Sequence, residues 1–127
     1  MSIRIHFAAF ALLLSAVAAG AGEVRPFDAA AFEAAQGAQK PIVVHVTATW
    51  CPTCQAQIPI VQSLADDPAN PDLIVFTVDF DTEATVLRRF DVRHQSTLIA
   101  FHGTEERSRS VGDTNPGRIA ALVAAAR

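Results

Sequence analysis

Two apolar runs rich in β-branched residues dominate the hydropathy pattern, at residues 42–48 and 73–80. Runs of this length are typical of strands buried on both faces of a sheet. Residues 97–101 predict a third strand. The alternation over residues 107–111, after a turn at residues 102–105, predicts an edge strand. The last two strands should therefore form a hairpin.

Helices are predicted between these strands, because apolar residues recur there at helical spacing. The predicted helices span residues 28–36, 52–65 and 82–90, and a last one is capped by Thr114 or Asn115. In the second helix Ile58, Val61 and Leu64 are expected to face inward. Pro59 lies inside the same helix and is expected to kink it.

The order of these elements predicts the fold class. Strands that alternate with helices pair in parallel through right-handed crossovers, and a terminal hairpin adds antiparallel strands. We therefore expect an α/β fold in which a central mixed sheet carries helices on both faces. One domain, residues 22–127, accounts for the whole pattern.

The first 21 residues predict a secretory signal peptide. Arg4 precedes an apolar stretch at residues 7–18, and the small residues 19–21 provide a cleavage pattern. The stretch is shorter than the ~20 apolar residues that a membrane-spanning helix needs, which favours a signal peptide over the alternative of an uncleaved membrane anchor. We expect cleavage after Ala21 and export to the periplasm.

The charge balance argues against nucleic acid as a partner. Loss of Arg4 with the leader reduces ten basic residues to nine, against thirteen acidic ones, for a net charge of −4. A chain this acidic lacks the basic surface that a phosphate backbone requires. We expect a monomer that binds no nucleic acid.

Cys51 and Cys54 are the only cysteines of the chain, and they lie where a predicted strand ends and a helix begins. Unpaired N–H groups and a partial positive charge at a helix N-terminus favour a thiolate at Cys51. Pro52 suits the first helical turn, where its missing N–H would have no partner. Cys54 can close a small disulfide ring and so resolve a mixed disulfide formed at Cys51.

Three alternatives to this redox role remain open. The pair could form a structural disulfide, although so short a loop would add little stability. Cys51 and Cys54, together with His94, could hold a soft ion such as Cu(I), whereas two thiols are too few for a closed zinc site. The domain could also be a redox-silent binding module.

The chain resembles the thioredoxin family from Phe27 to its C-terminus. The resemblance rests on Trp50 with the Cys-x-x-Cys pair, on Pro59 five residues after Cys54, and on residues 97–103. It implies a thioredoxin fold and a thiol–disulfide oxidoreductase that needs no cofactor beyond a redox-active Cys51–Cys54 disulfide. The central Pro-Thr pair resembles that of the periplasmic reductases of cytochrome c maturation, but the chain has no room for their inserted segment.

Two positions depart from the thioredoxin pattern. His45 stands where thioredoxins place a buried acid, and Ser96 stands where they place a cis-proline opposite the dithiol. A cis bond before a residue other than proline costs ~3 kcal/mol, so the Gln95–Ser96 bond should be trans. We expect the altered loop to leave more space beside the sulfurs.

The resemblance and the residues together suggest roles for the site. Cys51 is the expected nucleophile and Cys54 the resolving thiol. His45 is either a hydrogen-bonded core residue or a proton acceptor for Cys54, because histidine exchanges protons near neutral pH. The residues expected to bind substrate are Trp50, Pro52, Gln95, Ser96 and Thr97.

The resemblance also implies the partners. Protein disulfides would be the substrates, and a membrane thiol-electron transporter would supply the electrons. The opposite direction, in which the pair acts as a dithiol oxidant, is the second possibility within this class.

Overall fold

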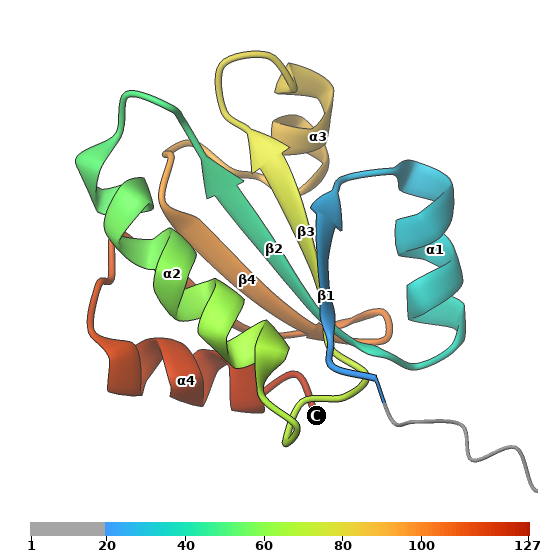
Figure 1. Ribbon diagram of the computed structural model, residues 1–127. Coiled ribbons are helices and arrows are strands. Elements are labelled where there is room, and N and C mark those ends of the chain that lie inside the picture. Colours follow the sequence, from blue (N-terminus) through green and yellow to red (C-terminus); the bar gives the residue numbers. More distant parts are fainter. Residues whose placement is uncertain (1–19) are drawn as a thin grey trace, which may run out of the picture.

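The computed structural model describes residues 20–127, so the predicted signal peptide lies almost entirely outside the described residues (Figure 1). The elements, in chain order, are β1 (Glu23–Pro26), α1 (Ala29–Gly37), β2 (Pro41–Thr47), α2 (Pro52–Asp66), β3 (Ile74–Asp79), α3 (Ala84–Arg89), β4 (Thr97–His102), β5 (Glu105–Val111) and α4 (Pro116–Ala124). Within this part of the chain, no helix combines the length and apolar character needed to cross a membrane.

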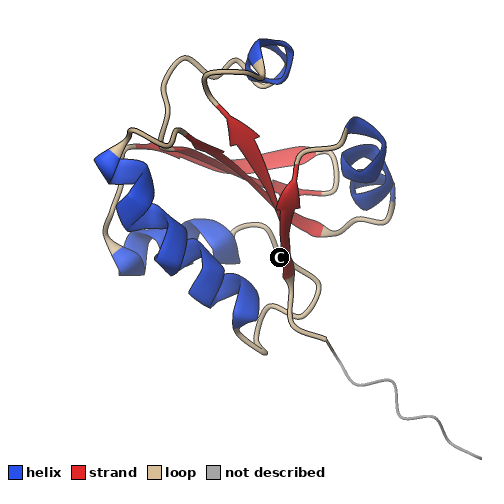
Figure 2. Cartoon of the chain, turned by 45° about the horizontal axis from the view of Figure 1, so that its top comes forward, coloured by secondary structure: helices blue, strands red, loops and turns tan. Residues whose placement is uncertain are grey.

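The five strands form one mixed sheet in the order β1-β3-β2-β4-β5. β2 pairs in parallel with β3 and antiparallel with β4, so it occupies the centre of the sheet. α2 and α4 cover one face of the sheet, and α1 and α3 lie on the other side (Figures 1 and 2). The predicted α/β fold with a mixed sheet and helices on both faces is confirmed.

Each face of the sheet has its own core because side chains alternate along a strand. Val44 and Val46 of β2 point to the side of α1, where Phe32 packs edge-on against neighbouring rings such as Phe76. Val43 points to the opposite side, among residues of α2 and α4. Since His45 lies two residues beyond Val43, it belongs to the α2 side of β2.

Two sequence predictions need correction here. β1 was not predicted, because it has only four residues, two of them charged, and all four lie exposed at the sheet edge. Ile58 was expected to face inward but is 41% exposed. The buried face of α2 consists of Cys54, Gln57, Val61 and Ala65. A polar residue therefore occupies a position that the apolar pattern could not reveal.

The ends of two helices follow local rules. Asp28 caps α1 by accepting a hydrogen bond from the Ala31 N–H at 2.9 Å. Asn115, one of the two predicted caps, caps α4 in the same way by accepting from the Arg118 N–H.

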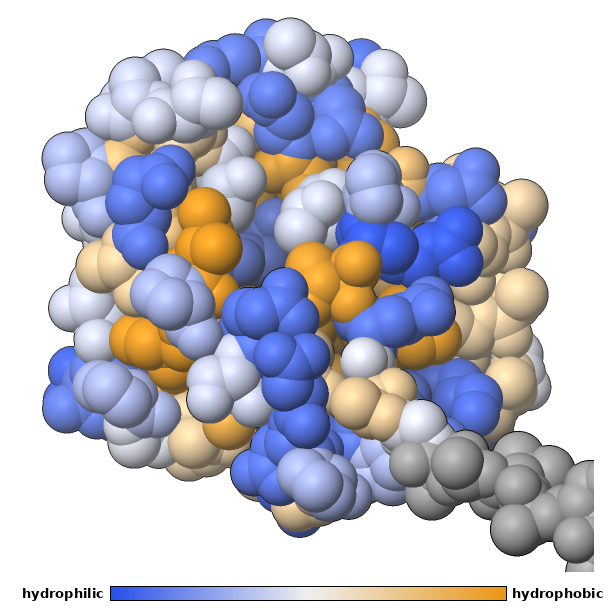
Figure 3. All heavy atoms as spheres, in the orientation of Figure 1, coloured by the Kyte–Doolittle hydropathy of each residue, from blue (hydrophilic) through white to orange (hydrophobic). Residues whose placement is uncertain are grey.

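On the face shown in Figure 3, hydrophobic residues form small separate patches among hydrophilic ones.

Candidate active site

The two cysteines lie at the junction of β2 and α2. Cys51 is the N-cap residue of α2, and its sulfur accepts a hydrogen bond from the Cys54 N–H at 3.2 Å. Pro52 follows at the first helical position, where a missing N–H costs nothing. The sulfur of Cys51 thus takes the place that a capping oxygen has in other helices, and faces the positive end of the helix.

Both thiols are free and buried. Cys51 exposes 2% of its surface and Cys54 exposes none, and they pack with Ala48 and the partly buried Phe80. Burial of an ionisable group disfavours its charged form, so any thiolate here depends on hydrogen bonds.

The two thiols differ in acidity. Burial is the largest influence on Cys51 and raises its pKa, but bonds from Cys54, Ser96 and the backbone N–H groups together hold that pKa below its usual range. Burial also raises the pKa of Cys54. There the hydrogen bond to Cys51 and the charge of Cys51 add to the rise. The thiolate therefore forms first on Cys51.

Ser96 reaches both sulfurs from the loop before β4. Its Oγ atom lies 3.1 Å from the sulfur of Cys51 and 3.0 Å from the sulfur of Cys54. The predicted trans Gln95–Ser96 bond is confirmed, since residues 20–127 contain no cis peptide bond. The expectation of extra space beside the sulfurs is wrong, because the Ser96 hydroxyl occupies that space.

The backbone of Ser96 has a φ of +60°, in the left-handed region that residues with a Cβ seldom adopt. Three hydrogen bonds hold it there. Its N–H donates to the Val46 carbonyl at 2.8 Å, and its carbonyl accepts from the Gly112 N–H at 3.0 Å and from Gln57 Nε2 at 3.1 Å. Ser96 is therefore fixed from β2, α2 and the turn after β5 at once.

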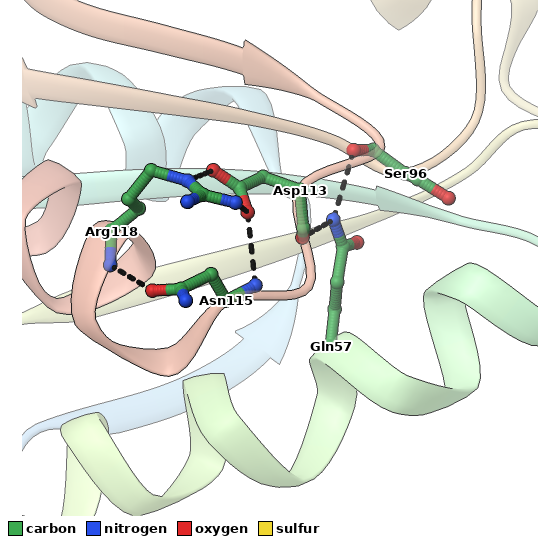
Figure 4. A network of polar contacts seen from close by, with 5 residues as sticks. All are labelled: Gln57, Ser96, Asp113, Asn115 and Arg118. Carbon is green, nitrogen blue, oxygen red and sulfur yellow. Dashed lines mark hydrogen bonds and ion pairs between the residues drawn. The ribbon is translucent and has the colours of Figure 1, made fainter.

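Gln57 is the site residue that the sequence did not predict. Its side-chain nitrogen donates to the carbonyl of Ser96 and, at 2.8 Å, to the carbonyl of Asp113 (Figure 4). Figure 4 shows Gln57 extending from α2 between the two loops, while the Ser96 hydroxyl points away from it. The available signal was a polar residue three positions after Cys54, on the same face of α2.

His45 is 2% exposed and uses Gln57 as its hydrogen-bond partner, with 3.0 Å between Nε2 and the Gln57 Oε1 atom. Burial is the larger influence and lowers the pKa of His45, and the bond to Gln57 opposes it only in part. The imidazole is therefore neutral at pH 7. His45 is linked through Gln57 to the loop that carries Ser96, and it makes no hydrogen bond of its own to a sulfur.

The remaining predicted site residues lie around the dithiol with different exposures. Trp50 is 57% exposed, and its indole N–H donates to Asp81 at 2.8 Å. Pro52 is exposed and Gln95 is half-buried. Thr97 is buried, and its hydroxyl donates to the carbonyl of His94 at 2.7 Å. The Thr97 hydroxyl thus shapes the loop rather than facing solvent.

The residues of 20–127 contain no group of three His, Cys, Asp or Glu side chains placed to hold a metal ion. His94 is exposed, and no contact joins it to either sulfur in this part of the chain. In the described part of the chain, a Cu(I) ion held by Cys51 and Cys54 would therefore have no third protein ligand.

A dithiol at the amino end of a helix, beside the central strand of a mixed sheet, defines the class of protein. A family model described as Thioredoxin matches residues 23–125, and the chain belongs to the thioredoxin family. It is 39% identical over 80 residues to Thioredoxin H-type of Brassica campestris, covering 63% of each chain. It is 37% identical over 73 residues to a thioredoxin of Mycobacterium tuberculosis, covering 58% of this chain and 62% of that one.

The chain thus spans 63% of the length of the Brassica relative that it matches. Among solved structures, the Trxlp protein of Edwardsiella tarda aligns with a TM-score of 0.77 and 40% identity, over 80% of this chain and 98% of that one. Thioredoxin of Malassezia sympodialis aligns with a TM-score of 0.70 at 24% identity, over 80% and 90% of the two chains. The second likeness concerns the fold alone.

Proposed function

We propose that this protein is an exported thiol–disulfide oxidoreductase that reduces disulfides of periplasmic proteins through Cys51 and Cys54. The observation that carries the proposal is the asymmetry of the pair: the Cys51 sulfur caps α2 and accepts from the Cys54 N–H, whereas Cys54 is fully buried. Despite its own burial, the pKa of Cys51 is held low by hydrogen bonds, while burial and Cys51 raise the pKa of Cys54. One thiol is prepared to attack, and the other keeps its proton until the first has reacted.

The reaction has two exchanges. The Cys51 thiolate attacks a substrate disulfide, a Cys51–substrate bond forms, and the first substrate sulfur leaves as a thiolate that takes up a proton. Cys54 then gives up its proton and attacks the Cys51 sulfur. The Cys51–Cys54 bond forms, and the second substrate sulfur leaves and is protonated. Two electrons pass from the protein to the substrate.

The loop at residues 95–97 supports the docking role that the resemblance implies. A surface cavity of about 440 Å³ borders it, lined by residues that include Val92, His94, Arg109 and Val111. This hollow offers room for a segment of substrate chain next to the loop.

The reducing direction rests on the resemblance of the Pro52-Thr53 pair to that of cytochrome c maturation reductases. A membrane thiol-electron transporter would then regenerate the dithiol. A relative from Mycobacterium leprae, 34% identical over 85 residues, bears the name Bifunctional thioredoxin reductase/thioredoxin, so a thioredoxin reductase is the other electron source to test. A reduction potential near −270 mV is expected of a reductase, and one near about −120 mV of an oxidant.

The test of the activity is reduction of insulin by dithiothreitol with the chain from Gly22 onward as catalyst. Cys51→Ser should abolish turnover, and Cys54→Ser should accumulate mixed disulfides because nothing resolves them. Ser110→Ala, a change on β5, is the control and should keep the turnover of the wild type. Full turnover by Cys51→Ser would reject the mechanism.

Export is tested separately. N-terminal sequencing of the protein from a periplasmic fraction should find Gly22 as the first residue. An intact Met1 end in the cytosolic fraction would reject export and leave the chemistry untouched.

A further inference from the structure

A single hydroxyl lies between the two reacting sulfurs. Ser96 Oγ is 3.1 Å from Cys51 and 3.0 Å from Cys54, and the residue is only 3% exposed. A hydroxyl has one proton to donate and two lone pairs. It can therefore donate to only one sulfur at a time while it accepts from the other.

The position of this hydroxyl is fixed, although its proton is free to turn. The hydrogen bonds of Ser96 to Val46, Gly112 and Gln57 hold the backbone from three elements. Rotation about the Cβ–Oγ bond moves only the proton. The donor can therefore change partners without any movement of the loop.

We propose that the Ser96 hydroxyl follows the negative charge during turnover, donating to the Cys51 thiolate in the reduced protein and to the Cys54 thiolate in the mixed disulfide. This role rests on the proposed thiol–disulfide exchange. It differs from the substrate-docking role expected for position 96, because its contacts are to the sulfurs themselves.

The steps of the exchange explain why the donor must turn. When Cys51 bonds to a substrate sulfur, it loses its negative charge and becomes a weak acceptor. Cys54 then releases its proton to solvent, and its thiolate becomes the stronger acceptor for the Ser96 proton. When Cys54 attacks Cys51, the disulfide closes and neither sulfur is charged.

No ionic side chain competes for this task. Within residues 20–127, the hydrogen bonds to the sulfurs come from Ser96, from neighbouring backbone groups and from the other cysteine of the pair. Among the nearby titratable groups, His45 is bonded to Gln57, and Asp81 is bonded to Trp50. The Asp113 carboxylate pairs with Arg118, so it too is engaged elsewhere.

Ser96→Ala and Ser96→Gly test the role as a pair. Both delete the hydroxyl, but alanine keeps the unfavourable φ of +60° whereas glycine adopts it freely. The readouts are thiolate absorbance against pH and the equilibrium of the dithiol with glutathione, neither of which needs a protein substrate. Ser110→Ala is the matched control, because it deletes a buried hydroxyl for which the described residues offer no partner.

Both variants should raise the pKa of Cys51 and shift the glutathione equilibrium toward the oxidised protein by about tenfold, the scale of one hydrogen bond to a charged group. With 5-thio-2-nitrobenzoate as the leaving group, both should also lengthen the lifetime of the mixed disulfide. The Ser110→Ala protein should match the wild type in all three measurements.

Unchanged values in both variants would show that the hydroxyl only fills space and would overturn the proposal. If the values change in Ser96→Gly but not in Ser96→Ala, the cause is the backbone rather than the hydroxyl, and the proposal is also overturned. A wild type that binds no glutathione and reduces no insulin would instead reject the proposed function, while the pKa comparison would still decide the role of Ser96.

Discussion

The imidazole of His45 is linked to Gln57 by a 3.0 Å hydrogen bond between Nε2 and Oε1. The amide nitrogen of Gln57 already donates to the carbonyls of Ser96 and Asp113, so its oxygen must be the acceptor for His45. His45 therefore carries its proton on Nε2. This chain of bonds couples the central strand to the loop that holds the Ser96 hydroxyl over the sulfurs.

Gln57→Leu should lower the free energy of unfolding by about 1–3 kcal/mol, the cost of leaving buried polar groups without a partner. The carbonyl of Ser96 keeps its bond from Gly112, so most of the loss should come from His45 and Asp113. Urea denaturation measures the effect. Gln55→Leu, an exposed change on the same helix, is the control, and equal stability of the two variants would contradict the network.

The lowered pKa of His45 predicts a pH dependence of stability. The unfolded chain has the ordinary value of about 6.5, so below that pH it binds more protons than the folded protein. The contribution of neutral His45 to stability is complete above about pH 6.5, and it is lost as the pH falls toward the pKa of His45 in the folded protein. His45→Asn should flatten the rise of unfolding free energy as the pH increases toward about 6.5.

Urea titrations at a series of pH values provide this measurement. His94→Asn, which removes an exposed histidine, is the matched control. A slope in His45→Asn equal to that of the wild type would mean that His45 does not titrate differently in the two states.

His45→Ala should slow the resolving step near neutral pH without abolishing turnover, because the neutral imidazole can accept and release a proton and so can assist transfer of the Cys54 proton to solvent. The measurement is the pH–rate profile for release of substrate from the mixed disulfide. If that profile is unchanged while stability falls, His45 acts as a core residue only.

Ser96→Pro should destabilise the protein by at least ~1 kcal/mol. Proline holds φ near −65°, whereas Ser96 has a φ of +60°, and proline also lacks the N–H that donates to Val46. Thermal unfolding beside Ser96→Gly isolates the cause, since glycine keeps both the φ and the N–H. A proline variant as stable as the wild type would show that the loop adopts a second arrangement at little cost.

The sequence by itself determined the order of elements from α1 onward and the place of the dithiol. Local physics is sufficient there: Asp28 caps α1, β-branched runs form the buried strands, and Cys51 with Pro52 begins α2. These features depend on residues a few positions apart, and their spacing is visible in the chain.

Only the tertiary structure decided what surrounds the sulfurs. Ser96 meets Cys51 across 45 positions and Cys54 across 42, and Gln57 meets Asp113 across 56. The left-handed backbone of Ser96 depends on those distant partners, because a residue with a Cβ has no local preference for it. For that reason the sequence predicted a dithiol with open space beside it, whereas the folded chain places a hydroxyl between the sulfurs.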